Sequence, residues 1–404
     1  MPGSDATIGT RVRKLRERAG KSRAALAGLL GKSEDWLKKI ERGERGLTVQ
    51  MATRLARQLG IRDFREIYGD DLATPVVTTD RPSHPLADSV GLALTTYLPR
   101  NDEPVALDHL KARVHSTWRT WHNSPTMRTD VASALPSLIT GARMAVAGAD
   151  SDADRRTARF VLSEVYHLGQ AYLAWVDGAT HWYWLTVDRG LQMGEDADNP
   201  TARASALMYY AFALRASGQA EGALDVLHTA VEALNPVLES GDHDVWGMRG
   251  ALHLAIASTA ARHLGDPSAW LAVEEADRVA SRLPTGYVHP RHPFSRSHVD
   301  VHRCWVAQSL GDVSEALRHA DAIEPDDIPS RVWQAQHLIN VARAYHQRRD
   351  TTALLPLVQA ERYSREAVQF SLPAREVIAD LARNGRDAVR REASALAERV
   401  KVLV

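Results

Sequence analysis

The sequence predicts an all-α protein, with a small N-terminal helical domain followed by a longer stack of helical hairpins. Three observations predict this fold. Between residues 22 and 43, two short helical patterns flank a single glycine. From residue 86 onward, no segment alternates apolar and polar residues as a half-buried strand does. In that region, glycines that end helical patterns recur 40 to 47 residues apart, a period typical of helical repeats.

The segment from Ser22 to Gly43 predicts a helix-turn-helix unit. Ser22 and Ser33 stand where a hydroxyl can cap the first turn of a helix. Gly31 lies between the two helical patterns, where a sharp turn favours a residue without a side chain. The second helix buries few residues and is otherwise polar, as a helix that lies in the major groove of DNA must be. Its apolar side consists of Trp36, Leu37 and Ile40.

Residues 8 to 69 resemble the phage-repressor type of helix-turn-helix domain, also called the Cro/C1 or XRE type. The matching pieces are Arg16, the run Ser22–Ala27, the turn Gly31 and the run Ser33–Gly43. The resemblance implies an ion pair between Arg16 and Glu41. The sequence departs from the family at Arg23, where the family often carries Gln, and at the acidic residues Glu34 and Asp35. Acidic side chains repel phosphates but can accept a hydrogen bond from cytosine N4.

We therefore expect this domain to bind double-stranded DNA. Residues 8–69 hold 16 Lys and Arg against 7 Asp and Glu, whereas the rest of the chain holds 34 against 43. A basic head on an acidic body is the pattern expected when only the head meets a polyanion. Lys38 and Lys39 are expected to meet bases or phosphates. The full predicted DNA interface is Arg23, Ser33, Glu34, Asp35, Lys38, Lys39, Arg42 and Arg45.

The composition suits a protein of the cytoplasm with no membrane partner. Cys304 is the one cysteine among 404 residues, so no internal disulfide can form. The N-terminus lacks an apolar signal region, and no apolar run approaches membrane-spanning length. Residues 70–85 contain three prolines and no helical period, which predicts a semi-extended linker after a domain of residues 1–69.

The body from residue 86 to 372 resembles degenerate tetratricopeptide repeats, of which residues 204–236 are the clearest copy. The predicted turns fall at Gly178, Gly218, Gly265, Gly311 and Arg349–Asp350. Seven residues before each turn stands a small residue, which lets two helices approach closely; these are Ala171, Ala211, Ser258, Cys304 and Ala342. A non-repetitive α-helical bundle is the alternative. Residues 86–150 fit the repeat poorly, and residues 373–404 are expected to cap the stack.

The first helix of each hairpin should line the concave face of such a stack, with exposed positions three and six residues before the turn. These positions are a mixture of aromatic, basic and amide side chains, which suits an extended, partly apolar ligand with a carboxylate. Inter-repeat packing is the alternative for any one of the aromatic residues. With His298 included, the predicted ligand-binding residues are Tyr172, Trp175, Phe212, Arg215, Arg262, His298, Trp305, Gln308, Arg343 and His346.

Motifs for catalysis are missing from the sequence. It has no phosphate-binding GxxxxGK, no GxSxG, no HExxH and no CxxC, so we expect no enzyme activity and no cofactor. His298 and His302 stand four apart, a spacing at which two histidines on a helix can share a metal. Because no carboxylate or thiolate stands in an obligate position beside them, we expect no metal site.

The whole arrangement resembles the peptide-pheromone regulators of Gram-positive bacteria, of the PlcR, Rgg and AimR type. This resemblance implies a transcriptional regulator that senses a peptide, or else a small acidic molecule. A DNA-localised scaffold whose repeats bind a partner protein is the alternative. A regulator of this kind is expected to act as a homodimer on an inverted-repeat operator. A C-terminal apolar stripe is the predicted interface, formed by Val377, Leu381, Val389, Leu396 and Val400.

Overall fold

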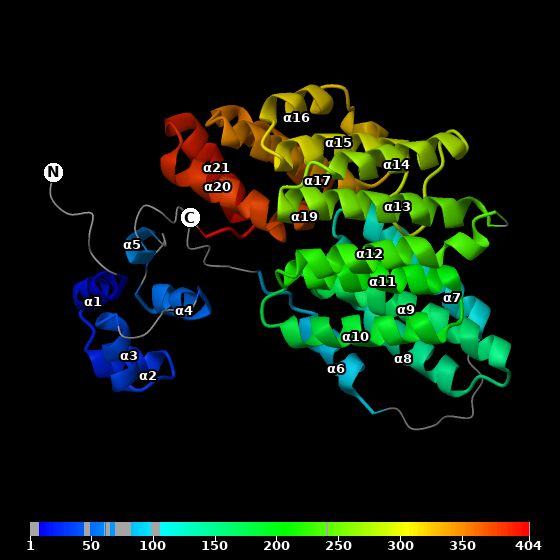
Figure 1. The fold of residues 1–404 in the computed structure, drawn as a ribbon, viewed down its shortest axis with the longest axis horizontal. Helices are drawn as coiled ribbons and strands as arrows, with labels where there is room; N and C mark the ends of the chain where they lie inside the picture. The colour runs from blue at the N-terminus through cyan, green and yellow to red at the C-terminus, as the bar shows by residue number, and fades with distance from the viewer. Residues whose placement is uncertain are drawn as a thin grey trace. The chain divides into compact units, whose positions relative to one another are not determined.

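The computed structural model describes residues 8–43, 49–59, 61, 65–68, 82–97, 106–239 and 241–403. The chain divides into two compact units, Met1–Asp80 and Arg81–Val404, which are described separately. All regular elements within the described ranges are helical, which confirms the predicted all-α fold (Figure 1).

The N-terminal unit consists of short helices packed around one small core. Its helices are α1 (Ile8–Arg18), α2 (Arg23–Leu29), α3 (Glu34–Glu41), α4 (Val49–Leu59) and α5 (Arg65–Tyr68). The predicted caps are confirmed, because the hydroxyl of Ser22 accepts from the Ala25 amide at 3.1 Å and that of Ser33 accepts from the Trp36 amide at 3.2 Å. Gly31 has a φ of 67°, so the turn between α2 and α3 uses the left-handed conformation that glycine allows.

The core of this unit holds the apolar face of each of its helices. Leu26, Leu37 and Leu55 are fully buried in it, and Trp36 packs against its edge. Gly9 allows α1 to approach the end of α3, since a Cβ at this position would lie 2.4 Å from the carbonyl oxygen of Ile40. The two helices are thereby held in close contact.

The second unit begins with a small group of helices that precede the repeats. These are α6 (Ala87–Thr95), α7 (Leu107–Asn123) and α8 (Met127–Ala147). Five helical hairpins follow: α9 (Asp152–Leu173) with α10 (Thr180–Asp196), α11 (Pro200–Ala216) with α12 (Ala220–Ala233), α13 (His243–Thr259) with α14 (Ala269–Arg282), α15 (Arg296–Ser309) with α16 (Val313–Ala320), and α17 (Arg331–Gln347) with α18 (Leu354–Tyr363). The π-helical segment η2 (Ala260–Leu264) continues α13. The chain ends with α19 (Arg365–Gln369), α20 (Leu372–Asn384) and α21 (Asp387–Arg399).

Each of the five predicted repeat turns contains a residue with positive φ. Gly178, Gly218, Gly265 and Gly311 have φ values of 73°, 86°, 64° and 89°. Arg349, at the fifth turn, has a φ of 58° although it is not a glycine. Positive φ is uncommon outside glycine, so Arg349 adopts the left-handed backbone of the four glycines despite its side chain.

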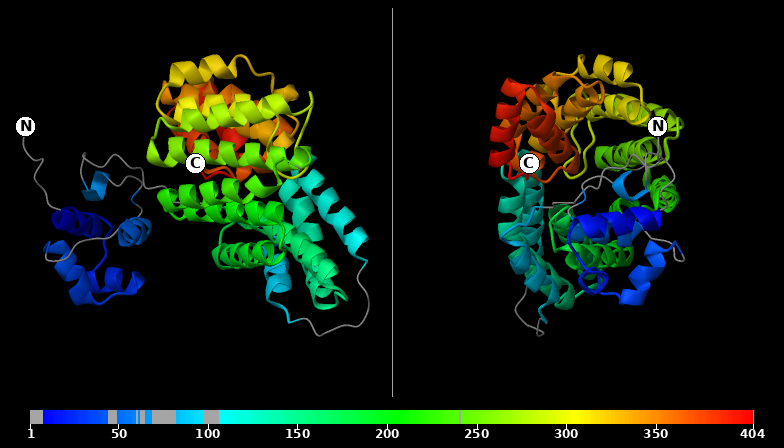
Figure 2. Two further views of the ribbon diagram at one scale, coloured as in Figure 1. Left: turned by 45° about the vertical axis from the view of Figure 1, so that its right-hand side comes forward. Right: turned by 90° about the vertical axis from the view of Figure 1, so that its left-hand side faces the viewer.

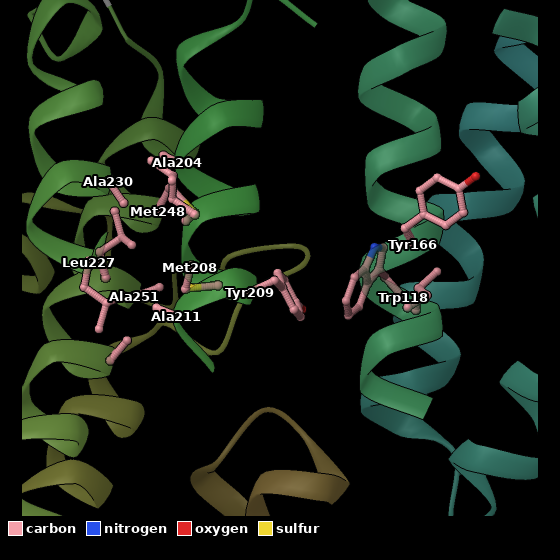
Figure 3. Close-up of a cluster of buried hydrophobic side chains, with 14 of the residues drawn as sticks. Trp118, Tyr166, Ala204, Met208, Tyr209, Ala211, Leu227, Ala230, Met248 and Ala251 are labelled. Atoms are coloured by element: carbon pink, nitrogen blue, oxygen red, sulfur yellow. The ribbon is translucent and has the colours of Figure 1, made fainter. Parts of the chain in front are cut away.

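Small residues allow neighbouring hairpins to pack closely. Ala204 and Ala211 of α11 lie with Ala230 of α12 and Ala251 of α13 around Met208 and Met248 (Figure 3). Three of the five small residues predicted to pack before each turn, Ala211, Cys304 and Ala342, are buried. The side chain of Tyr209 points away from these residues and toward Trp118 of α7; the centroids of the two rings are 6.3 Å apart.

The C-terminal helices return to the start of the repeat unit. Glu366 of α19 is buried and accepts from the backbone amides of Arg128 and Thr129 at the first turn of α8. His122 at the end of α7 contacts the carbonyl oxygen of Arg291 at 3.0 Å and the hydroxyl of Ser330 at 3.3 Å. Figure 2 shows the C-terminal helices (red) next to this cyan part of the chain. The repeat unit is therefore closed by contacts between its two ends.

Two predictions about the ends of this unit are wrong. Residues 82–85 were predicted as linker, but the carbonyl of Pro82 accepts from Asp177, and the buried His84 contacts the Tyr172 hydroxyl at 2.8 Å. The predicted C-terminal apolar stripe is not available to a second copy, because it packs inside the monomer. Val377, Leu381, Leu396 and Val400 are buried in the C-terminal core, and Val389 packs against it. Linker residues 70–81 lie outside the described residues.

None of the helices in the described part of the chain is long and apolar enough to cross a membrane.

Candidate functional site

Helix α3 presents a polar outer face. Leu37 and Ile40 are buried beneath it, while the side chains that point away from the core are exposed. The exposed predicted DNA-binding residues on and beside α3 are Ser33, Glu34, Asp35, Lys38, Lys39 and Arg42. Lys39 forms an ion pair with Asp35 at 2.8 Å, which lowers the pKa of Asp35 and partly offsets its repulsion of a phosphate.

Three arginines from different hairpins form a cluster, here named the arginine cluster. Arg215 ends α11, Arg262 lies in the π-helical segment η2, and Arg343 lies in α17. Burial and, to a smaller extent, the charge of Arg262 together lower the pKa of Arg215 and of Arg343 to about 10. Although the side chain of Arg262 reaches solvent, the surrounding protein lowers its pKa as well, through loss of hydration.

Neutral groups hold two of these arginines in place. Arg215 donates to the hydroxyl of Thr259 at 3.3 Å and lies 4.7 Å from the ring centre of Phe212. Arg343 donates to the amide oxygen of Gln308 at 3.5 Å. These contacts position the guanidinium groups without neutralising them.

Among the described residues, no carboxylate lies within ion-pair distance of the arginine cluster. The charges of Arg343 and Arg262 act on Glu376 and favour its ionised form. Loss of hydration has the larger effect, so the pKa of Glu376 is raised. Cations that are poorly hydrated and unpaired are costly in a folded protein. Such groups gather at functional sites, so the cluster is a candidate site for an anion.

Helix α15 carries polar and aromatic residues along one side, from its first turn to the arginine cluster. His298, His302, Trp305 and Gln308 follow one another at intervals of four, three and three residues, and so share a face. Trp305 stacks on Trp333 of α17 with ring centroids 5.1 Å apart. The indole nitrogen of Trp305 and the amide nitrogen of Gln308 are buried and have no hydrogen-bond partner in the described structure. The unpartnered amide nitrogen of Gln308 therefore belongs to a side chain that contacts Arg343.

Comparison with known protein families identifies the type of the N-terminal domain. Residues 7–63 match a family described as a helix-turn-helix domain. The N-terminal unit has a helix-turn-helix fold. The two serines cap the helices α2 and α3, and the glycine forms the turn between them, as in a helix-turn-helix unit.

Two solved structures show a distant likeness to the chain. PlcR of Bacillus thuringiensis, solved with the peptide PapR7 and DNA, is 13% identical, with a TM-score of 0.27 over 69% of this chain and 95% of that one. ComR of S. thermophilus, solved with DNA and its signalling peptide ComS, is 15% identical, with a TM-score of 0.29 over 88% of this chain and 99% of that one. No curated protein sequence matches this chain.

Within the helix-turn-helix domain, Glu41 is the shared partner of two arginines. The implied pair with Arg16 is confirmed, with Nε 2.5 Å from Oε1 and both side chains buried. Arg23 donates its Nε to the other oxygen of Glu41 at 2.9 Å, with about a third of its side chain exposed. Arg23 thus has a structural partner in addition to any phosphate. Arg45 lies outside the described residues.

The structure separates several predicted ligand residues from the arginine cluster. Tyr172 is fully buried and belongs to the core, which corrects its placement on the inner face. Trp175 follows the end of α9 and has a φ of 68°, so it lies in the turn and not on the helix. His346 is paired with Asp380 of α20 at 2.8 Å. His298 lies about 15 Å along α15 from Gln308, at 1.5 Å per residue.

Thr259, Trp333 and Glu376 are residues near the cluster that the sequence did not identify as site residues. Thr259 stands six residues before the turn at Gly265, a position expected on the concave face, but a hydroxyl side chain alone did not indicate ligand binding. Trp333 and Glu376 lie outside the counted positions, and only the packing of α17 and α20 brings them near. In the described ranges, no group of three His, Cys, Asp or Glu residues is arranged to hold a metal.

Proposed function

We propose that this chain is a DNA-binding transcriptional regulator whose repeat unit responds to a ligand with a carboxylate. The observation that supports it best is the arginine cluster, in which Arg215, Arg262 and Arg343 lie close together without a described carboxylate partner. A carboxylate on the ligand can form charge-assisted hydrogen bonds with two or more of these guanidinium groups. Binding would relieve the repulsion between them.

The helix-turn-helix domain is proposed to place α3 in the major groove. Lys38, Lys39 and Arg42, together with Arg45 of the following segment, are proposed to meet phosphates or bases. Arg23 is proposed to contact a phosphate from its place beside Glu41. Glu34 and Asp35 are proposed to face base edges, because a carboxylate can accept from cytosine N4.

A short peptide with a free C-terminus suits the second site best. Its carboxylate would meet the arginine cluster, and a peptide carbonyl can accept from the unused donors of Trp305 and Gln308. Phe212, Trp305 and Trp333 offer apolar rings for its side chains. A small acidic metabolite would use the arginines alone and is the next candidate.

Regulation requires that the ligand bind two arrangements of the protein with different affinity. The arginines belong to separate hairpins, so a carboxylate between them would draw these hairpins together. In a helical-repeat protein, small rotations between neighbours add up along the stack. We propose that this change alters the DNA affinity of a homodimer on an inverted repeat, with half-sites about 34 Å apart or a multiple of that distance.

The test uses a pool of peptides with free C-termini and the same pool with amidated C-termini. Binding is followed by tryptophan fluorescence of the full chain, and DNA sites are first selected from a random duplex pool. The proposal predicts that free peptides bind, that amidated ones bind at least tenfold more weakly, and that Arg262→Ala removes this difference. Equal binding of both pools would contradict it. Light scattering with and without the selected DNA tests the dimer, and a monomer in both would refute that part.

A further inference from the structure

The arginine cluster extends across several neighbouring helices. Arg215 belongs to α11, Arg262 follows α13 in η2, and Arg343 belongs to α17. Helix α13 packs against α11 and α15, and α15 packs against α17, so these four helices form a row. Axes of packed helices are about 8–10 Å apart, so the side chains of the cluster start from widely separated backbones. A single carboxylate has both oxygens on one carbon atom, which is a short span for such a row.

Arg262 is the middle member of the cluster. Burial lowers the pKa of Arg215 and of Arg343, and the charge of Arg262 adds to the effect on both. Glu376 of α20 acts on the other side of the cluster, where its charge favours the charged forms of Arg343 and Arg262. The contact of His346 with Asp380, at 2.8 Å, holds α20 against α17. Arg215 and Arg343 therefore flank Arg262.

The positive charges of the cluster exceed the negative charge near it. Three arginines and Glu376 leave two positive charges uncompensated when Glu376 is ionised, and three when it is protonated. No other carboxylate in the described part of the chain forms an ion pair with these arginines. A ligand with one carboxylate would compensate only one of these charges.

A ligand can reach all three guanidinium groups. Arg262 is exposed, and Arg215 and Arg343 are partly exposed. In the described structure, Arg215 donates to the Thr259 hydroxyl at 3.3 Å and Arg343 to the Gln308 amide oxygen at 3.5 Å. Both distances are at or beyond the long end of the usual range for such bonds. Because a guanidinium has five N–H donors, most of its donors remain for a bound anion.

We infer that the ligand carries two acid groups at one end, namely its C-terminal carboxylate and the side chain of a C-terminal Asp or Glu. This inference rests on the proposed function, because it concerns the same ligand. One carboxylate would lie between Arg215 and Arg262 and the other between Arg262 and Arg343, each forming charge-assisted hydrogen bonds. The two carboxylates of a C-terminal Asp or Glu suit this arrangement, since they diverge from one Cα and are held at a fixed short separation.

The experiment compares three pools of random peptides of equal length, which differ only at the C-terminus. One pool ends in Glu with a free carboxylate, the second ends in Gln with a free carboxylate, and the third ends in Glu with an amidated C-terminus. Binding to the full chain is followed by tryptophan fluorescence at constant ionic strength. The free Glu pool should bind about tenfold more tightly than either of the other two, because each of them lacks one carboxylate.

Substitutions test which arginine meets which carboxylate. Of Arg215→Gln and Arg343→Gln, one should remove the preference for Glu over Gln, and the other the preference for the free over the amidated C-terminus. Arg249→Gln is the matched control and should keep both preferences, since Arg249 is partly exposed and donates to neutral oxygens elsewhere on α13. Glu376→Gln should strengthen binding of the free Glu pool, because it removes a charge that repels the ligand.

The outcomes separate this inference from the proposed function. If wild-type protein binds the free Glu and free Gln pools equally, the inference is overturned while the proposed function stands. If neither free pool binds, both are overturned. Preferences that persist unchanged in Arg215→Gln and in Arg343→Gln would also overturn the inference. Should one of these variants fail to fold, as judged by circular dichroism, the wild-type comparison of the Glu and Gln pools decides.

Discussion

Arg343 donates to the amide oxygen of Gln308 at 3.5 Å, and this contact leaves the amide nitrogen of Gln308 buried without a partner. The pair fixes one guanidinium of the arginine cluster and at the same time presents an unused donor next to it. Unpaired, poorly hydrated cations destabilise the protein when the site is empty, and a bound anion is expected to remove that destabilisation.

The first prediction concerns the stability of the empty protein. Arg262→Ala should raise the free energy of unfolding slightly, by less than about 1 kcal/mol, because it removes a cation that lies near Arg215 and Arg343. Urea unfolding followed by tryptophan fluorescence measures it. Arg278→Ala is the control, since Arg278 is exposed and paired with Glu275, and it should not stabilise. A destabilised Arg262→Ala protein would show that the cluster is not under repulsion.

The second prediction concerns DNA. Lys38→Ala should weaken binding to all duplex sequences by a similar factor and reduce the slope of log K against log salt by about one, if Lys38 meets a phosphate. Fluorescence anisotropy from 50 to 200 mM salt gives the slope. Arg155→Ala, which removes a partly exposed arginine of the second unit, should leave the slope unchanged. An unaltered slope for Lys38→Ala would move the DNA contact away from this face of α3.

The third prediction concerns the helix-turn-helix domain itself. Glu41→Gln should destabilise this domain by about 3–5 kcal/mol, since it removes the buried carboxylate that pairs with Arg16 and with Arg23 and leaves Arg16 only its longer contact with Glu17. Hydrogen exchange of amides in residues 8–43 reports on this unit. Glu17→Gln breaks a pair with Arg13 in which both side chains are at least half exposed, together with a 3.4 Å contact to Arg16, and should have a much smaller effect. Equal effects of the two substitutions would contradict the prediction.

The fourth prediction concerns pH. Burial lowers the pKa of His302 and of His337 to about 4, against about 6.5 in an unfolded chain. Below pH 6.5 the unfolded chain takes up protons that the folded one does not. The stability from these neutral rings is therefore complete above pH 6.5 and falls as the pH drops toward 4.

The loss should approach about 1.4 kcal/mol per pH unit for each histidine. Urea unfolding at a series of pH values between 7.5 and 5 measures the slope. His337→Gln should reduce the slope of the unfolding free energy against pH by the contribution of one histidine. His115→Gln, at an exposed position, should leave the slope unchanged. A slope that is unchanged in His337→Gln would mean that this ring is hydrated in solution.

The sequence predicted the turns of the repeats because their geometry depends on a local property, positive φ. Counting back from a turn identified Arg215, Arg262 and Arg343. The count worked in these hairpins because each helix ends only one or two residues before its turn, at Ala216, Leu264 and Gln347. The count failed in the first hairpin because α9 ends at Leu173, five residues before Gly178. Trp175 therefore falls in the turn, and Tyr172 falls in the core.

Contacts between distant parts of the chain could not be read from the pattern. The C-terminal helices carry an apolar stripe that resembles an exposed interface until α17 and α18 are seen to cover it. Nothing in the sequence near His346 indicates a partner, but its ring contacts the carboxylate of Asp380 of α20. His122 of α7 contacts the carbonyl oxygen of Arg291, which lies 169 residues further along the chain. Such pairings depend on the folded path of the whole unit.

The central claim is that a carboxylate at the arginine cluster changes the affinity of the protein for DNA. The most direct measurement is the affinity for selected duplex DNA, by fluorescence anisotropy, with and without a saturating concentration of the tightest free-carboxylate peptide from the pool. The wild-type protein should change its affinity at least fivefold on adding the peptide, and Arg262→Ala should show no change at the same concentration. A wild-type protein that binds the peptide but keeps the same DNA affinity would contradict the claim. The repeats would then serve as a binding surface without a regulatory link to DNA.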